Sequence, residues 1–276
     1  MSHQVPLGDV AGLRLNLRDG GDWPQDLAFV PVSTTELHLA ARSFPLAVRQ
    51  GEGAPRLGLL VGADTLVSPL RTTTGAWRGG YQPIGLRTLP LVAISDTNDA
   101  LADLVIDSDT PSLSADAGVP IADTAGRPSP AIVELHRLAV LLTRSAIAFA
   151  PALDHLLIAG LLAPLSASSS DTAGDPQYLV IDPAAFERLD GAALGAMARH
   201  SYLSVDLAVA GMFSLQALHP ERRPQTTHGT VATPSMTPIA MLADIPFDEL
   251  EFALDDGELI PFGGFVERAT ASGPDA

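Results

Sequence analysis

The longest helical pattern in the chain runs from Ser129 to Phe149 and reads SPAIVELHRLAVLLTRSAIAF. Ser129 followed by Pro130 is typical of a helix N-terminus, because the fixed φ of proline suits the first helical turn. Apolar residues then recur at a helical spacing of three and four, which predicts one buried face. They are Ile132, Leu135, Leu138, Ala139, Leu142, Ala146 and Phe149. Pro151 is expected to end or kink this helix, with a second short helix over residues 152–162.

Short apolar runs precede the helix and predict a small, mostly antiparallel sheet, because turns that contain Gly or Pro separate them. The runs cover residues 27–32, 57–61, 65–67, 89–94 and 104–106. A short helix is expected after the first run, since Ser33 and Glu36 have the spacing of a capping box.

The chain after the long helix is predicted to be mainly helical. Residues 178–181 have the apolar character of a strand that returns to the sheet, and short helices are expected from Pro183 and Asp190. Residues 201–218 are apolar nearly all round, which predicts a helix buried in the chain's own core or in a homo-oligomer interface. The predicted fold class is therefore α+β, with an N-terminal mostly antiparallel sheet and a helical C-terminal half.

Three segments are predicted along the chain. Residues 1–26 are rich in Gly and Asp with isolated apolar residues, which indicates an irregular lead-in. Residues 27–218 form the α+β domain. Residues 219–276 comprise a linker, a hairpin about Asp255-Asp256-Gly257, and a disordered C-terminal tail.

The composition excludes several classes of protein. The 276 residues include 16 Arg and Lys, all of them Arg, against 32 Asp and Glu, so the formal net charge is −16. Nucleic-acid binding and binding to anionic membranes are therefore not expected. Without cysteine the chain forms no disulfide, thiolate zinc site or thiol nucleophile, and without lysine it has no P-loop. Apolar stretches at 146–165 and 202–218 each contain an aspartate, so no membrane span is expected.

The acidic residues are concentrated in segments 96–123 and 244–258, which favours a partner with a basic surface. The first segment lacks the residue order of an EF-hand, so we interpret it as a solvated loop rather than a Ca²⁺ site. The N-terminus has no basic region followed by an apolar one. A cytoplasmic location is therefore expected, with signal-independent export left open.

A series of short fragments extends from Phe29 to Leu218. They are FVPV at 29–32, AAR at 40–42, GAW at 75–77, YQP at 81–83, RTLPL at 87–91, IDSD at 106–109, PIAD at 120–123, GRPSP at 126–130, LLAPL at 161–165 and YLVID at 178–182. In order and spacing the series resembles the SapC family, named after a protein encoded in bacterial surface-layer (S-layer) loci. Thr88 departs from a second Arg in the family pattern, and the chain beyond His219 is not matched.

The resemblance implies a bacterial accessory protein in an S-layer or outer-membrane uptake context, with no established catalytic mechanism. Trp77, Tyr81 and Arg87 are the predicted partner-binding residues, because aromatic side chains beside an Arg are typical of interface hot spots. The leading hypothesis is therefore a non-enzymatic accessory or binding protein that recognises a protein or peptide. No catalytic residue and no cofactor are assigned to it.

The alternative hypothesis is a metal-dependent, oxygenase-like enzyme or a subunit of an enzyme complex. Its candidate ligands are Glu36 and His38, which would share one face of a strand but diverge on a helix. A third ligand would have to come from elsewhere in the chain. Metal analysis of the purified protein separates the two hypotheses.

Overall fold

The structure is a computed structural model that describes residues 3–17, 27–51, 53–62, 65–67, 81–165, 177–199 and 201–223. The chain divides into two units, and all of the described residues belong to the first, Met1–Thr227. The hairpin expected about Asp255-Asp256-Gly257 lies outside the described residues, as does the tail that follows it.

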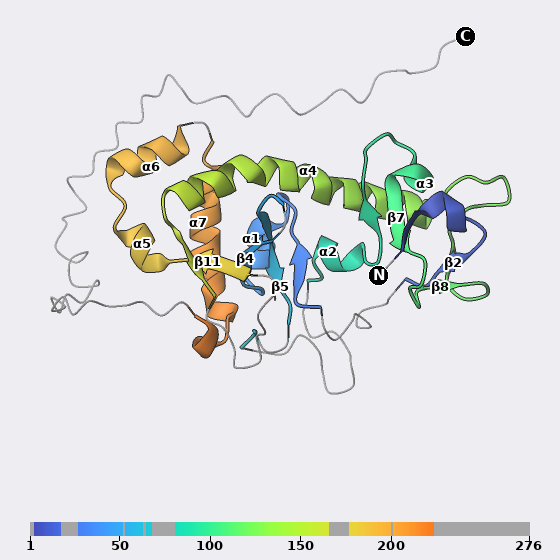
Figure 1. Cartoon of the computed structure of the whole chain (residues 1–276), viewed down its shortest axis with the longest axis horizontal. Helices are drawn as coiled ribbons and strands as arrows, with labels where there is room; N and C mark the ends of the chain where they lie inside the picture. Colours follow the sequence, from blue (N-terminus) through green and yellow to red (C-terminus); the bar gives the residue numbers. More distant parts are fainter. Residues whose placement is uncertain are drawn as a thin grey trace, which may run out of the picture. The chain divides into compact units, whose positions relative to one another are not determined.

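A five-stranded antiparallel sheet lies at the centre of this unit (Figure 1), with strand order β10-β11-β4-β5-β3. The strands are β3 (Phe29–Pro31), β4 (Leu46–Gln50), β5 (Arg56–Leu60), β10 (Leu162–Pro164) and β11 (Gln177–Ile181). The strands predicted near 27–32, 57–61 and 178–181 are confirmed. β11 follows the long helix in sequence yet pairs with β4 in the centre of the sheet. The α+β prediction is confirmed, and this sheet joins the two halves of the chain.

Two strands of the sheet differ from the prediction. No strand is expected at β4, whose apolar residues Leu46, Ala47 and Val48 follow the short helix α1 (Leu37–Ala41) after four intervening residues. β4 is extended because it pairs with β5 on one side and with β11 on the other. β10 occupies the end of the helix predicted over residues 152–162, and it pairs with β11.

Two three-stranded sheets lie at the opposite end of the long helix from β10 and β11 (Figure 1). One has the order β1-β7-β6 and the other β8-β2-β9. Their strands are β1 (Gln4–Pro6), β2 (Arg14–Leu15), β6 (Val92–Ala93), β7 (Leu104–Asp107), β8 (Leu113–Ser114) and β9 (Val119–Pro120). β7 confirms the strand expected at 104–106.

Residues 4–15 correct the expectation of an irregular lead-in. They form β1, the 3-10 helix η1 (Leu7–Val10) and β2. Leu7 and Leu15 are completely buried, and Val5, Val10, Leu13 and Leu17 pack around them. Each short strand is completed by a remote one, as β1 is by β7, and this pairing has no local sequence signal.

The long helix is confirmed as α4 (Pro130–Ile158), and it begins after Ser129 as expected. It contributes to two hydrophobic clusters. The main core lies between the five-stranded sheet and helices α1, α4 and α7 (Leu203–Ser214), and includes Phe149 and Leu153. The small-sheet core surrounds Leu7 and includes Ile132 from the first turns of α4. α4 therefore connects two cores that no other long element connects within the described residues.

Pro151 lies inside α4 and does not end it, which corrects the expectation of two separate helices. A proline removes the hydrogen bond to the carbonyl four residues earlier, here that of Ile147. Pro151 is exposed, and the Ile147 side chain is 71% exposed. On this solvated side, water can hydrogen-bond to the released carbonyl.

By length and composition, α4 is the only helix among the described residues that is apolar enough to cross a membrane. Ten of its residues are buried in the protein itself. Residues of α4 pack in both hydrophobic cores, whereas Val133, Ile147 and Ile158 are exposed.

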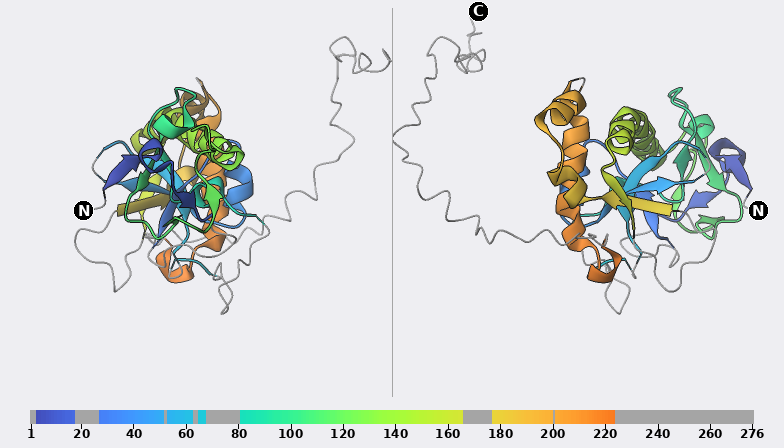
Figure 2. Two further views of the ribbon diagram at one scale, coloured as in Figure 1. Left: turned by 90° about the vertical axis from the view of Figure 1, so that its right-hand side faces the viewer. Right: turned by 60° about the vertical axis from the view of Figure 1, so that its left-hand side comes forward.

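Helices α5 (Pro183–Glu187), α6 (Gly191–Ala198) and α7 follow β11, as predicted. α7 lies beside α4 (Figure 2) and packs on the sheet, where a Cβ added at Gly211 would lie 2.4 Å from Cγ1 of Ile181. The helix is not buried all round in the chain's own core, because Tyr202, Val209 and Phe213 are 73%, 49% and 51% exposed. The alternative, a homo-oligomer interface, stays a prediction. A helix that contacts the sheet and α4 on one side leaves its outer side to solvent.

A pair of stacked aromatic rings lies on the face of the sheet away from the main core. Phe29 of β3 and Tyr178 of β11 have ring centroids 5.7 Å apart, although two strands separate them in the sheet. Ala47 and Gly58 are paired with each other on those intervening strands. Their small size leaves room for the rings, since a Cβ at Gly58 would lie 2.3 Å from Cζ of Phe29 and 2.3 Å from the Val30 carbonyl oxygen.

Gly58→Ala is therefore expected to lower the free energy of unfolding by about 2 kcal/mol, because the added methyl group must displace a ring and a neighbouring strand. Chemical denaturation measures the change. Gly12→Ala is the matched control, since a Cβ at this exposed glycine meets nothing within 4 Å. Equal stability of the two variants would contradict the packing of Phe29 over Gly58.

Candidate functional site

Glu36 is a buried carboxylate, 4% exposed, that holds the start of two helices. Its Oε1 accepts the Ser33 N–H at 2.9 Å, and its Oε2 accepts the Ile84 N–H at 2.9 Å and the hydroxyl of Tyr81. The bond to Ser33 is one contact of the predicted capping box, but α1 has Glu36 rather than Ser33 as its N-cap, so the box does not cap the helix. The Ser33 hydroxyl instead contacts Thr35 Oγ1 at 2.9 Å. Glu36 thereby connects the turn before α1 to the N-terminus of α2 (Ile84–Arg87).

Tyr81 is fixed by this carboxylate and stands near Arg87. Burial raises the pKa of the Tyr81 hydroxyl, and the hydrogen bond to Glu36 and its negative charge raise it further, while the charge of Arg87 lowers it. The net effect is a raised pKa, so the hydroxyl stays protonated and continues to donate to Glu36 at physiological pH. Arg87 is exposed at the last position of α2. The structure thus brings together two of the three predicted partner-binding residues, and Trp77 lies outside the described residues.

Glu36 and His38 have different surroundings. Glu36 is buried, whereas His38 is exposed on α1, so the pair takes the helical arrangement in which i and i+2 diverge. Both oxygens of Glu36 already accept hydrogen bonds. Among the residues that the structure describes, no group of three His, Asp or Glu side chains is placed to hold a metal ion.

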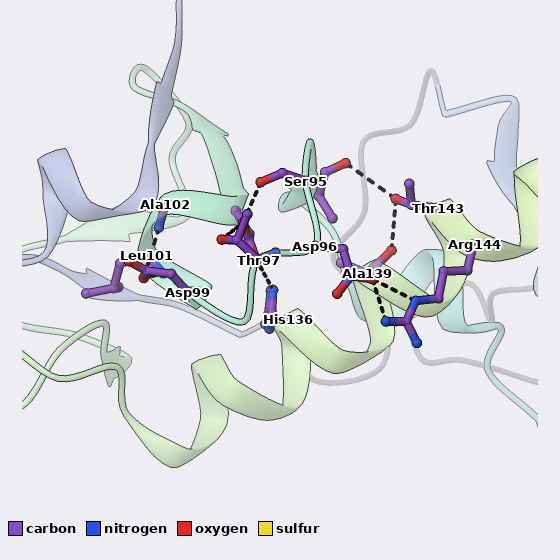
Figure 3. A network of polar contacts seen from close by, with 12 residues as sticks. Ser95, Asp96, Thr97, Asp99, Leu101, Ala102, His136, Ala139, Thr143 and Arg144 are labelled. Atoms are coloured by element: carbon purple, nitrogen blue, oxygen red, sulfur yellow. Dashed lines mark hydrogen bonds and ion pairs between the residues drawn. The ribbon is translucent and has the colours of Figure 1, made fainter.

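Asp103 is the second buried carboxylate, and its side chain is completely inaccessible to solvent. It accepts hydrogen bonds from Thr97 N–H at 2.8 Å, Thr97 Oγ1 at 2.7 Å and the Ser95 hydroxyl, and it contacts His136 Nε2 at 2.9 Å (Figure 3). Asp103 ends α3 (Ala100–Asp103), and His136 projects from α4. The network therefore fixes the loop before α3, and α3 itself, to the long helix.

These contacts keep Asp103 charged. Burial by itself raises the pKa of the carboxyl group, but the hydrogen bonds from Ser95, Thr97 and His136 outweigh burial and hold the pKa well below its ordinary value. A charge in this position is stabilised by four donors rather than by solvent. The interpretation of segment 96–123 as a solvated loop is thus wrong for Asp103, which α3 and the following strand carry into the interior.

The Asp103 network contains serine, histidine and aspartate but lacks the order of a catalytic triad. Ser95 and His136 both bind the carboxylate, on different oxygens. Within this described network, no hydrogen bond joins Ser95 to His136. A triad needs the histidine between the other two, where it can take the serine proton. This arrangement supports structure rather than nucleophilic chemistry.

Other acids of segment 96–123 are used in exposed local contacts. Asp96 forms an ion pair with Arg144 of α4 (Figure 3), and Asp123 pairs with Arg127 at 2.8 Å. Asp99 caps α3 by accepting the Leu101 N–H at 3.1 Å. These contacts fit the expected solvated loop, in which carboxylates fix turns and helix ends.

The described residues form an α+β protein in which two buried carboxylates, those of Glu36 and Asp103, connect short loops to helices through hydrogen bonds. The chain belongs to the SapC family, because the SapC family model matches residues 9–220. The match begins before Phe29 and so includes β2, which the resemblance between Phe29 and Leu218 leaves out. No curated protein and no solved structure matches the chain.

Proposed function

We propose that this SapC-family chain is a non-enzymatic accessory protein that recognises a protein or peptide in an S-layer or outer-membrane uptake context. The observation that carries the proposal is the arrangement of Tyr81 and Arg87. Tyr81 is held by buried Glu36, and Arg87 is exposed at the end of the helix that begins beside it. A rigid aromatic residue next to an exposed Arg is a favourable element of a recognition surface, because little side-chain entropy is lost on binding.

The buried carboxylates support this proposal over an enzyme. Glu36 and Asp103 accept all their hydrogen bonds from donors of the same fold. Carboxylates whose oxygens are already used in this way hold loops and helices in place. The net charge of −16 further favours a partner with a basic surface.

Arg87→Ala is expected to weaken capture of the native partner by about tenfold, since hot-spot residues contribute about 1–2 kcal/mol or more to binding. The measurement is co-purification from native cells with the tagged full chain, followed by titration of the captured protein. The matched control is Arg199→Ala, an exposed arginine at the end of α6. Both variants should unfold at the same denaturant concentration as the parent chain.

Two results would reject the proposed function. One is equal partner binding by the Arg87→Ala and Arg199→Ala variants. The other is stoichiometric Fe, Mn or Zn in the purified protein that is lost in a His38→Ala variant, which would establish the metal-dependent alternative.

A further inference from the structure

The turn between β4 and β5 brings two arginines together. Arg49 of β4 is paired directly with Arg56 of β5, and both side chains are exposed. They lie on the same face as Ala47 and Leu60, because side chains alternate along each strand. This face is opposite the main core, which receives Val48 and Leu57. Like charges directly across two strands repel one another, so the pair costs stability by itself.

The structure offers no acidic partner for this pair within the described residues. No described carboxylate forms an ion pair with Arg49 or Arg56, whereas Arg127 and Arg144 each have an aspartate. From 49 to 56 the sequence contains two Arg and one Glu, a positive segment in a chain of net charge −16. The repulsion would be relieved by an anion bound between the two guanidinium groups.

An aromatic surface adjoins the arginine pair. Tyr178 is the partner of Arg49 on β11, so the order across the sheet is Tyr178, Arg49 and Arg56. The Tyr178 ring is held by its stack on Phe29, with an interplanar angle of 27°. The register therefore places Arg49 and Arg56 in a row with Tyr178, one ring of a half-buried aromatic pair.

We propose that Arg49 and Arg56 form a binding site for an oxyanion, a carboxylate or phosphate group, with Tyr178 beside it. A guanidinium presents several planar donors and binds both groups in a bidentate manner. The site is on the opposite side of the sheet from the main core, against which Tyr81 packs. It is therefore a second site, independent of the recognition surface proposed at Tyr81 and Arg87.

The test is a titration of the full chain with inorganic phosphate and, separately, with succinate, at constant ionic strength set by chloride. Binding is followed by the NMR signals of the arginine Nε–H groups and by calorimetry. We expect at least one probe to bind, and Arg49→Gln and Arg56→Gln to weaken its binding by about tenfold each, because each removes a charge-assisted bidentate contact. The probe that binds more tightly identifies the source of the oxyanion.

Arg199→Gln is the control and should bind as the parent chain does. Without a probe, Arg49→Gln and Arg56→Gln should be at least as resistant to unfolding as the parent at low salt, since each removes a repulsion. The proposal is overturned if neither phosphate nor succinate binds, or if both arginine variants bind them as tightly as the Arg199→Gln control. A failure of the Arg87→Ala experiment would leave these outcomes unaffected.

Discussion

Asp103→Asn is expected to lower the free energy of unfolding by about 3 kcal/mol at pH 7, because it leaves buried donors without their charged acceptor. The asparagine side chain would keep one carbonyl oxygen for Ser95, Thr97 and His136, which now share two carboxylate oxygens. The NH2 group of the asparagine would replace the other carboxylate oxygen, so a donor would lie against a donor. Urea denaturation of the parent chain and the variant measures the difference.

The difference in unfolding free energy between the parent chain and Asp103→Asn should depend on pH in a defined direction. The folded chain holds the pKa of Asp103 below its unfolded value of about 4. The carboxylate therefore stabilises the fold fully above that unfolded pKa, and this stabilisation disappears as the pH falls toward the folded pKa. The stability gap between the parent and Asp103→Asn should accordingly be largest near neutral pH and should shrink as the pH is lowered below about 4.

Two further variants test this interpretation. Asp96→Asn alters an acid of the same loop whose ion pair with Arg144 is exposed, so its effect should be within about 0.5 kcal/mol. Ser95→Ala removes one of the four donors to Asp103 and should cost about 1 kcal/mol even if the Asp103 variant does not fold. A gap between parent and Asp103→Asn that does not vary with pH would contradict a charged Asp103.

Phe149→Ala is expected to destabilise the protein by about 3–5 kcal/mol, the usual cost of removing a buried ring. Phe149 is 1% exposed in the main core, where α4 covers the five-stranded sheet. Ile147 is two residues away on the same helix and 71% exposed, so Ile147→Ala should change stability by less than about 0.5 kcal/mol. Equal effects of the two would contradict the orientation of α4.

The same experiment tests whether the two cores unfold together. Ile132 is fully buried in the small-sheet core, at the other end of α4. Because one continuous helix supplies both cores, Ile132→Ala and Phe149→Ala should shift the same single unfolding transition. Two separate transitions, each sensitive to one variant, would show that the helix is divided between Ile132 and Phe149 in solution.

Local patterns in the sequence predict much of the helical half. The start of α4 at Ser129-Pro130 and its apolar periodicity depend on neighbouring residues along the chain, so they can be recognised without a structure. The same holds for Ser33 and Glu36, whose hydrogen bond from the Ser33 N–H to the Glu36 carboxylate follows from their spacing. Pro151 shows the limit of such patterns, because its effect depends on whether the released carbonyl faces solvent.

The candidate sites are less predictable because they join remote residues. Tyr81 and Arg87 can be predicted as partner-binding residues from the sequence. The carboxylate that binds the Tyr81 hydroxyl belongs to Glu36, which is 45 residues away in the chain. His136 contacts Asp103 across 33 residues. Asp103 is one of several acidic residues in its segment, and the sequence does not indicate that it contacts His136.

Residue types and short spacings are enough to predict the fold class, the position of α4 and the family resemblance, and to exclude thiol and P-loop chemistry. Contacts between remote segments, by contrast, make Leu46–Gln50 a central strand, bury Asp103 in its charged form and pair Arg49 with Arg56. The physical reason is that strand pairing and side-chain burial depend on which remote segments meet. The free energy of those contacts is set by the whole fold rather than by neighbouring residues.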